Sequence, residues 1–125
     1  MNYHLTILGR PQPKQRPRTV QNDGKAHTYT PSETQQKEGE ILAEWLEKYG
    51  QVELEGNLTL TATFVYKKGP YADVSNLLKL VEDALGGGHK NLQPFNDKQI
   101  VSIHAHREKG EEAKTEITIT ERDKE

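Results

Sequence analysis

Apolar residues occupy every second position from Leu58 to Tyr66 in the segment LTLTATFVY, and this pattern constrains the fold of the 125-residue chain most strongly. A β-strand points successive side chains to opposite faces of its sheet, so this segment predicts a strand with one buried face. That face needs neighbouring strands and a covering layer, which the rest of the chain must supply.

Shorter alternating segments predict further strands, centred on Tyr3, Leu5 and Ile7, on Val101, Ile103 and Ala105, and on Ile117 and Ile119. The last two segments flank a turn at Lys109-Gly110, so we expect two terminal antiparallel strands. The tripeptide Asn22-Asp23-Gly24 marks another turn and predicts an irregular hairpin inside a basic, turn-rich region spanning residues 9–28.

Two segments have the apolar spacing of amphipathic helices. The first begins at Thr30-Pro31-Ser32-Glu33, which combines a capping hydroxyl with proline at the first helical position, and it ends at Gly50. Its polar first half is expected to be solvated. The second runs from about Val74 to Leu85 and stops at the glycines 86–88. Together these elements predict one α+β domain over residues 1–125, with one mixed sheet and two main helices.

Composition limits the classes of function. Only 32% of the residues are apolar and the mean hydropathy is −0.91, which indicates a thin core that would gain buried area by dimerisation. The absence of cysteine excludes disulfides and thiolate-bound metal. No export signal or membrane-spanning segment stands out, so we expect a cytoplasmic protein without a membrane partner.

Cations crowd the proline-rich segment GRPQPKQRPR at residues 9–18, where Arg10, Lys14, Arg16 and Arg18 lie. Prolines stiffen this loop, so its charge would be presented at low entropic cost, which suits contacts with phosphate. Arg107 could extend the same basic surface. A loop that only confers solubility is the alternative, and the net charge of −2 argues mildly against a polyanionic partner.

Polar residues also share one face of the second predicted helix. Asn76, Lys79 and Asp83 lie opposite the apolar arc, and Asp73 stands just before the first turn. These residues could form a catalytic face. The alternatives are a helix-capping aspartate and an ordinary solvated surface.

Asn96-Asp97 precedes the strand that begins near Ile100. A carboxylate at that position could join Asp73 in holding Mg²⁺, which prefers oxygen ligands and often uses one or two carboxylates. An Asx turn is the alternative. The five histidines show no convincing zinc spacing, although His104 and His106 would share a strand face.

The order of these motifs resembles the RusA family of phage and bacterial Holliday-junction resolvases, which act in DNA recombination and repair. The resemblance covers nearly the whole chain, through GRPQPKQRPR, HTYTP, DVSNLLKLVEDAL and FNDKQIVSI. It implies a homodimeric, RusA-like endonuclease that makes paired nicks in four-way DNA junctions with Mg²⁺, for which Mn²⁺ could substitute.

The resemblance also assigns roles to individual residues. Asp73 and Asp97 would hold the metal, Lys79 would stabilise transition-state charge, and Asn76 and Asp83 would orient the ligands. DNA contacts would come from Lys14, Arg16, Arg18 and Arg107, the last of which stands where the family has lysine.

Two departures from the family pattern affect the expected activity. Ser75 stands where the family has a second aspartate at the helix start, and Asn96 replaces the first residue of an Asp-Asp pair. Serine is a weak neutral ligand, so the site would hold a cation less well. The alternative function is therefore a weakened or inactive junction-binding protein on the same fold. A third interpretation is a small adaptor with no role in binding nucleic acid.

Overall fold

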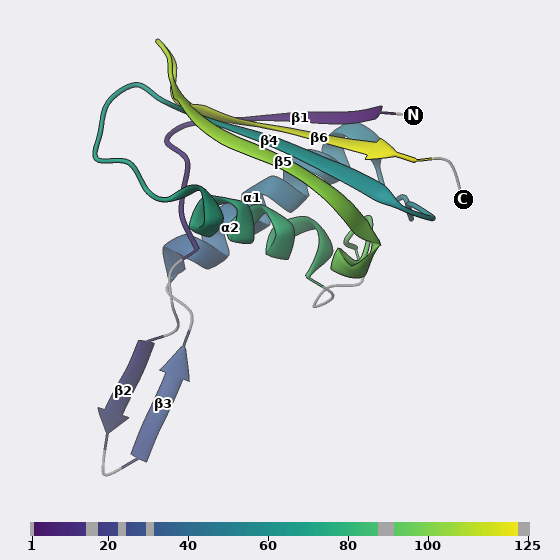
Figure 1. Cartoon of the computed structure of the whole chain (residues 1–125). Helices are drawn as coiled ribbons and strands as arrows, with labels where there is room; N and C mark the ends of the chain where they lie inside the picture. The colour runs from purple at the N-terminus through teal and green to yellow at the C-terminus, as the bar shows by residue number, and fades with distance from the viewer. Residues whose placement is uncertain (1, 15–17, 23–24, 30–31, 88–91, 123–125) are drawn as a thin grey trace.

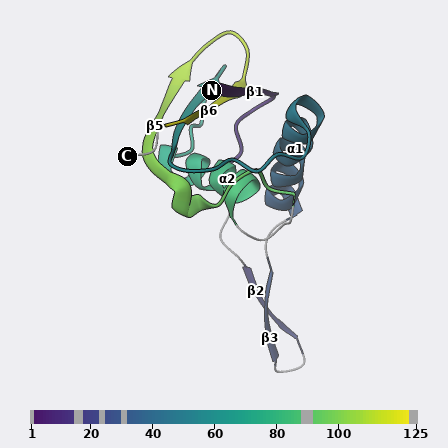
Figure 2. The ribbon, with the colours of Figure 1, turned by 90° about the vertical axis from the view of Figure 1, so that its right-hand side faces the viewer.

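The computed structural model describes residues 2–14, 18–22, 25–29, 32–87 and 92–122. Its body is a four-stranded sheet with two helices packed on one face (Figures 1 and 2). In chain order, the elements of this body are β1 (Asn2–Leu8), α1 (Ser32–Tyr49), β4 (Leu58–Tyr66), α2 (Val74–Gly86), the 3₁₀ helix η1 (Asp97–Gln99), β5 (Ile100–Lys109) and β6 (Lys114–Glu121). The predicted single α+β domain with one mixed sheet and two helices is confirmed.

Strand β4 lies in the interior of the sheet, whose order is β1-β6-β4-β5. Its alternating apolar residues are almost fully buried, as the sequence pattern predicts, and they face the helices. Helix α1 contributes Ile41, Leu42 and Trp45 to this core. Helix α2 contributes an apolar arc made of Leu77, Leu80, Val81, Ala84 and Leu85. The core therefore lies between one face of the sheet and the two helices.

The last two strands are antiparallel, as predicted, but they do not pair with each other. Strands β5 and β6 run antiparallel, but β4 lies between them, pairing parallel with β5 and antiparallel with β6. The connection after β5 crosses the end of β4, where the Gly110 N–H donates to the Tyr66 carbonyl at 2.9 Å. The most apolar strand thus takes an interior position, and β5 is left as an edge of the sheet.

The helices begin and end close to their predicted bounds. Helix α1 starts at Ser32, while the proposed capping residues Thr30 and Pro31 lie outside the described residues. It ends before Gly50, which has the positive φ of +73° that favours glycine. The expectation that its first half is fully solvated is wrong, because Thr34 is buried and the side chain of Glu38 is only 15% exposed.

The predicted hairpin in the basic region is present as a separate two-stranded antiparallel sheet. It consists of β2 (Arg18–Asn22) and β3 (Lys25–Tyr29), and it extends away from the body beyond the two helices (Figure 1). The predicted turn residues Asp23 and Gly24 lie outside the described residues. Among the described helices, none combines the length and apolar character that crossing a membrane requires.

The end of α2 is packed tightly against the segment that follows it. A Cβ added to Gly86 would lie 2.7 Å from Cδ2 of the buried Phe95 ring and 3.3 Å from the backbone nitrogen of Asp97. Glycine at this position therefore allows the chain around Asp97 to lie directly against the end of the helix.

We expect Gly86→Ala to lower the free energy of unfolding by about 1–3 kcal/mol, because the buried Phe95 ring must move. Gly39→Ala is the matched control: it lies inside α1 with no atom within 4 Å of the added Cβ, so it should stabilise the protein by about 0.5–1 kcal/mol. Urea denaturation of both variants measures the difference. Equal effects would contradict the close packing.

Candidate active site

Asp73 caps the N-terminus of α2. Its Oδ1 accepts a hydrogen bond from the Asn76 backbone N–H at 2.8 Å, and its Oδ2 accepts one from the Asn76 side-chain amide at 3.3 Å. Asp73 therefore does cap the helix, which the sequence analysis gave as the alternative to a catalytic role. Capping does not exclude a ligand role, because each oxygen of this exposed carboxylate keeps a lone pair and Mg²⁺ prefers such oxygens.

Two arginines hold the loop that leads from β4 into α2. The Arg107 guanidinium donates to the Ala72 carbonyl at 2.8 Å and stacks over the Tyr71 ring, 5.0 Å from its centre. The Arg10 guanidinium donates to the carbonyls of Lys68 and Pro70. Arg107 is exposed and could still meet phosphate, but the structure shows it first as a support of the residue before Asp73.

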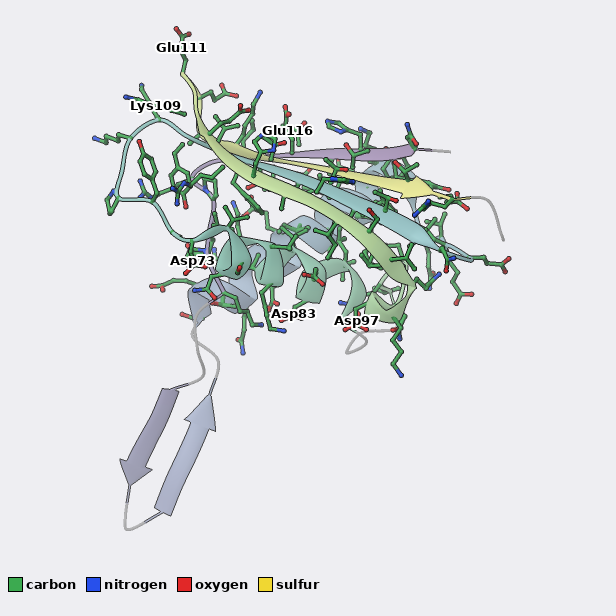
Figure 3. All side chains as sticks on the ribbon, in the orientation of Figure 1. Asp73, Asp83, Asp97, Lys109, Glu111 and Glu116 are labelled. Atoms are coloured by element: carbon green, nitrogen blue, oxygen red, sulfur yellow. The ribbon has the colours of Figure 1, made fainter. Side chains whose placement is uncertain are left out.

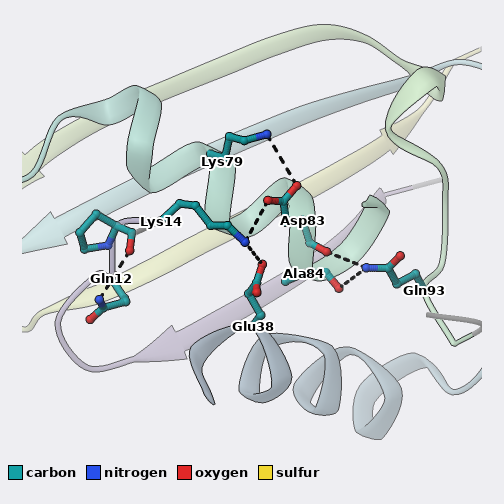
Figure 4. Close-up of polar contacts among 8 residues, drawn as sticks. Gln12, Lys14, Glu38, Lys79, Asp83, Ala84 and Gln93 are labelled. Atoms are coloured by element: carbon teal, nitrogen blue, oxygen red, sulfur yellow. Dashed lines mark hydrogen bonds and ion pairs between the residues drawn. The ribbon is translucent and has the colours of Figure 1, made fainter. Parts of the chain in front are cut away.

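Lys14, predicted to contact DNA, is instead bound between the two helices (Figure 4). Its ammonium lies 3.0 Å from Glu38 of α1 and 3.2 Å from Asp83 of α2, and its side chain is only 22% exposed. Burial lowers the pKa of Lys14, but hydrogen bonds and charges from the two carboxylates outweigh burial, so its pKa lies above the ordinary value. A DNA contact by Lys14 stays a prediction, and phosphate would have to compete with these two carboxylates.

Asp83 consequently faces the body of the protein. Besides Lys14 it has a more distant partner in the exposed Lys79 ammonium, 3.9 Å away on the preceding turn of α2. The sequence pattern places both residues on the polar helix face but gives no sign that Asp83 would share Lys14 with Glu38 of α1. That contact depends on how α1 packs beside α2.

Asp97 begins η1 just beyond the end of α2, and it is exposed. The preceding Asn96 accepts a hydrogen bond from the Lys98 backbone N–H at 3.0 Å, while its own backbone N–H donates to the Gln99 side chain at 2.8 Å. The Asx turn, which the sequence analysis gave as the alternative to a metal site, is therefore present as part of a capping box. Asparagine fills this capping position without a charge.

Asp73 and Asp97 do not meet within one chain, which corrects the expectation that each protomer holds a cation between them. They lie at opposite ends of α2 (Figure 3), which has 13 residues. A helix of that length spans about 20 Å, far beyond the reach of one ion. Among the described residues, no three acidic or histidine side chains gather closely enough to hold a metal.

Glu82 is an additional acidic residue near the end of α2 that the sequence reasoning missed. Burial raises its pKa, Lys79 lowers it, and the nearby negative charges of Asp83 and Asp97 raise it further, so the net shift is upward. The position of Glu82 on the helix gave no sequence signal of this environment, because Asp97 comes close only through the fold.

We expect Lys14→Met to lower the free energy of unfolding by about 1–3 kcal/mol, because Glu38 and Asp83 would be left facing each other. Lys79→Ala, the control that removes the exposed partner of Asp83, should change stability by less than about 1 kcal/mol. Urea denaturation of both variants checks this difference. Near-equal effects would contradict the structural role of Lys14.

Comparison with known proteins identifies the chain at the level of a family. Residues 9–120 match the family model described as "Endodeoxyribonuclease RusA". No curated protein matches the chain. The matched span begins just after β1 and covers the basic region, both helices, strands β4 and β5, and β6 except its last residue.

Proposed function

Because the chain belongs to the RusA endodeoxyribonuclease family, we propose that it cuts four-way DNA junctions by Mg²⁺-dependent phosphodiester hydrolysis with paired nicks. The observation that carries this proposal is the exposed start of α2, where Asp73, Asn76 and Lys79 lie within two turns. An acidic group, an amide and a cation at one helix start suit a site that binds a metal and a phosphate.

The opposite positions of Asp73 and Asp97 favour a site shared between two copies of the chain. A two-fold axis near the middle of α2 would run two such helices antiparallel, with Asp73 of each copy beside Asp97 of the other. Two equivalent sites result from this symmetry, one for each strand to be cut. A homodimer thus accounts for the separation that prevents a single chain from completing the site.

Exposed apolar side chains near α2 support a dimer surface on the same side of the molecule. Val101 and Ile103 of the edge strand β5 are 51% and 43% exposed. Ile103 pairs with Leu60 and Arg107 with Phe64, so these two β5 residues lie on the face of the sheet that the helices cover, and the Arg107 guanidinium reaches the loop before α2. Burying Val101 and Ile103 against a second copy would remove apolar surface from water, which favours association.

Individual residues take the following roles in this proposal. Mg²⁺, or Mn²⁺ in its place, would be held by Asp73 of one copy and Asp97 of the other, and it would polarise the scissile phosphate and activate a water. Lys79 neutralises negative charge that develops at phosphorus. Asn76 orients the Asp73 carboxylate through its amide. Asp83 positions Lys79 and Lys14 instead of facing the metal.

Contacts with the DNA backbone are assigned to the cations outside the Lys14 pair. Arg107 is exposed close to Asp73, and Arg18 belongs to the β2–β3 hairpin that extends from the body. Arg16, also assigned to DNA, lies outside the described residues. A two-stranded ribbon fits the major groove of B-form DNA, so the hairpin suits an arm that reaches along one duplex of the junction.

The alternative function, a junction-binding protein with little or no cleavage, rests on Ser75. This exposed residue lies in the first turn of α2, two positions after Asp73, and contributes no negative charge. Loss of one carboxylate weakens the hold on a cation but leaves the cations that meet DNA unchanged.

We expect the protein to nick a synthetic four-way junction with Mg²⁺, and we expect Ser75→Asp to raise the rate at limiting Mg²⁺ by about 10–100-fold, because it restores a negative ligand. Ser75→Asn is the matched control, similar in size but neutral, and should leave the rate unchanged. Gel assays over a range of Mg²⁺ concentrations measure the rates. Cleavage by Ser75→Asp alone would favour the binding protein, and cleavage by neither chain would remove the nuclease proposal.

We expect Asp73→Asn and Asp97→Asn each to abolish cleavage when expressed alone, and to restore part of it when co-expressed. A mixed dimer would contain one intact shared site, so random pairing should return about a quarter of the wild-type sites, which make single nicks instead of paired cuts. Asparagine keeps the capping function of residue 73, which limits any effect on folding.

Differently tagged chains allow the mixed dimer to be purified and assayed on the same junction. If the purified mixed dimer is as inactive as its parents, the shared arrangement is wrong.

A further inference from the structure

A cavity of about 310 Å³ lies directly before Asp73, between residues 10–13 and residues 70–72, with Tyr66 also on its wall. The two segments come from distant parts of the chain. They are held together where the Lys14 backbone N–H donates to the Asn76 carbonyl at 2.9 Å and the Tyr66 hydroxyl to the Pro11 carbonyl at 3.4 Å. The cavity is therefore built from fixed backbone next to the proposed catalytic carboxylate.

Tyr71 presents an aromatic ring on the wall of this cavity and remains 45% exposed. Its ring meets the Tyr66 ring edge-on, with centres 5.2 Å apart, and the Arg107 guanidinium stacks over it. Arg107 does not line the cavity, so the ring is supported without the cavity being filled. A large aromatic surface is thus held in place and still accessible.

The chemistry of the walls argues against a phosphate pocket. The Arg10 guanidinium lies over the Tyr66 ring and donates to the carbonyls of Lys68 and Pro70, so two of its five N–H donors are used within the protein. Prolines at positions 11, 13 and 70 contribute apolar surface and no N–H groups. The Gln12 side chain adds one amide, whose hydrogen bond to Pro13 is long at 3.5 Å.

We propose that this cavity receives one unstacked nucleobase of the DNA, which stacks on Tyr71 while the neighbouring phosphate lies at Asp73. A base is flat, neutral and aromatic, and it carries hydrogen-bonding edges that the Gln12 amide can meet. A base that is already poorly stacked costs least to extrude. The cavity therefore favours branch points over continuous duplex, which gives the proposed nuclease a means of selecting junctions.

This inference rests on the proposed function, and a double-mutant cycle between protein and DNA tests it. Binding is measured without divalent metal, so that no strand is cut, for the wild-type chain, Tyr71→Leu and Tyr71→Phe. The DNA is one four-way junction carrying either normal nucleotides or abasic sites at the crossover.

Tyr71→Leu should weaken binding of the normal junction about tenfold, as loss of one base–aromatic stack does, and binding of the abasic junction less than twofold. Tyr71→Phe should bind both junctions as the wild type does, since the ring is kept. Equal loss on the two junctions, or no loss on either, would overturn the inference.

A second measurement uses the wild-type protein, so its result does not depend on whether Tyr71→Leu folds correctly. A junction with 2-aminopurine at the crossover should change fluorescence on binding much more than one with 2-aminopurine in the middle of an arm. Similar changes at the two positions would also overturn the inference. If the wild-type chain binds no junction at all, the proposed function fails with it, whereas normal junction binding and cleavage by Tyr71→Leu removes this inference alone.

Discussion

The packing of the apolar arc of α2 against the sheet determines the rest of the site. Five almost fully buried side chains, Leu77, Leu80, Val81, Ala84 and Leu85, fix the rotation of this helix and its line across the sheet. Its polar face must then point outward, and its two ends must lie about 20 Å apart. Because Asp73 begins the helix and Asp97 lies against its end, the same packing that forms the core keeps the two carboxylates apart.

The cations of the basic region divide into two groups: those that bind groups of the protein itself and those that remain for DNA. Lys14 is drawn inward because Glu38 and Asp83 face each other across the helix pair and require a positive charge between them. Arg10 is likewise used inside the protein, on backbone carbonyls and an aromatic ring. Arg107 is exposed and Arg18 belongs to the hairpin, so both are separate from this internal pairing, and a net charge of −2 is compatible with a DNA substrate.

Contacts within the protein hold the loop before Asp73 in place. Arg107 and Arg10 bind three of its carbonyl oxygens, and Tyr71 packs between Tyr66 and Arg107. A carboxylate fixed in this way loses little freedom when it takes up a cation or meets a phosphate. Tyr71 remains 45% exposed in this arrangement, so the same contacts support Asp73 and shape the neighbouring cavity.

The sequence by itself determined the elements. Alternation along β4 and the apolar arc of α2 depend on local geometry, and the order of short motifs indicated the family and predicted its site residues. Only the tertiary structure decided which of these residues meet. The interior position of β4, the partnership of Lys14 with Glu38 and the separation of Asp73 from Asp97 all arise from contacts between segments far apart in the chain. Such contacts leave no periodic signal, because packing selects them only after the helices and strands have formed.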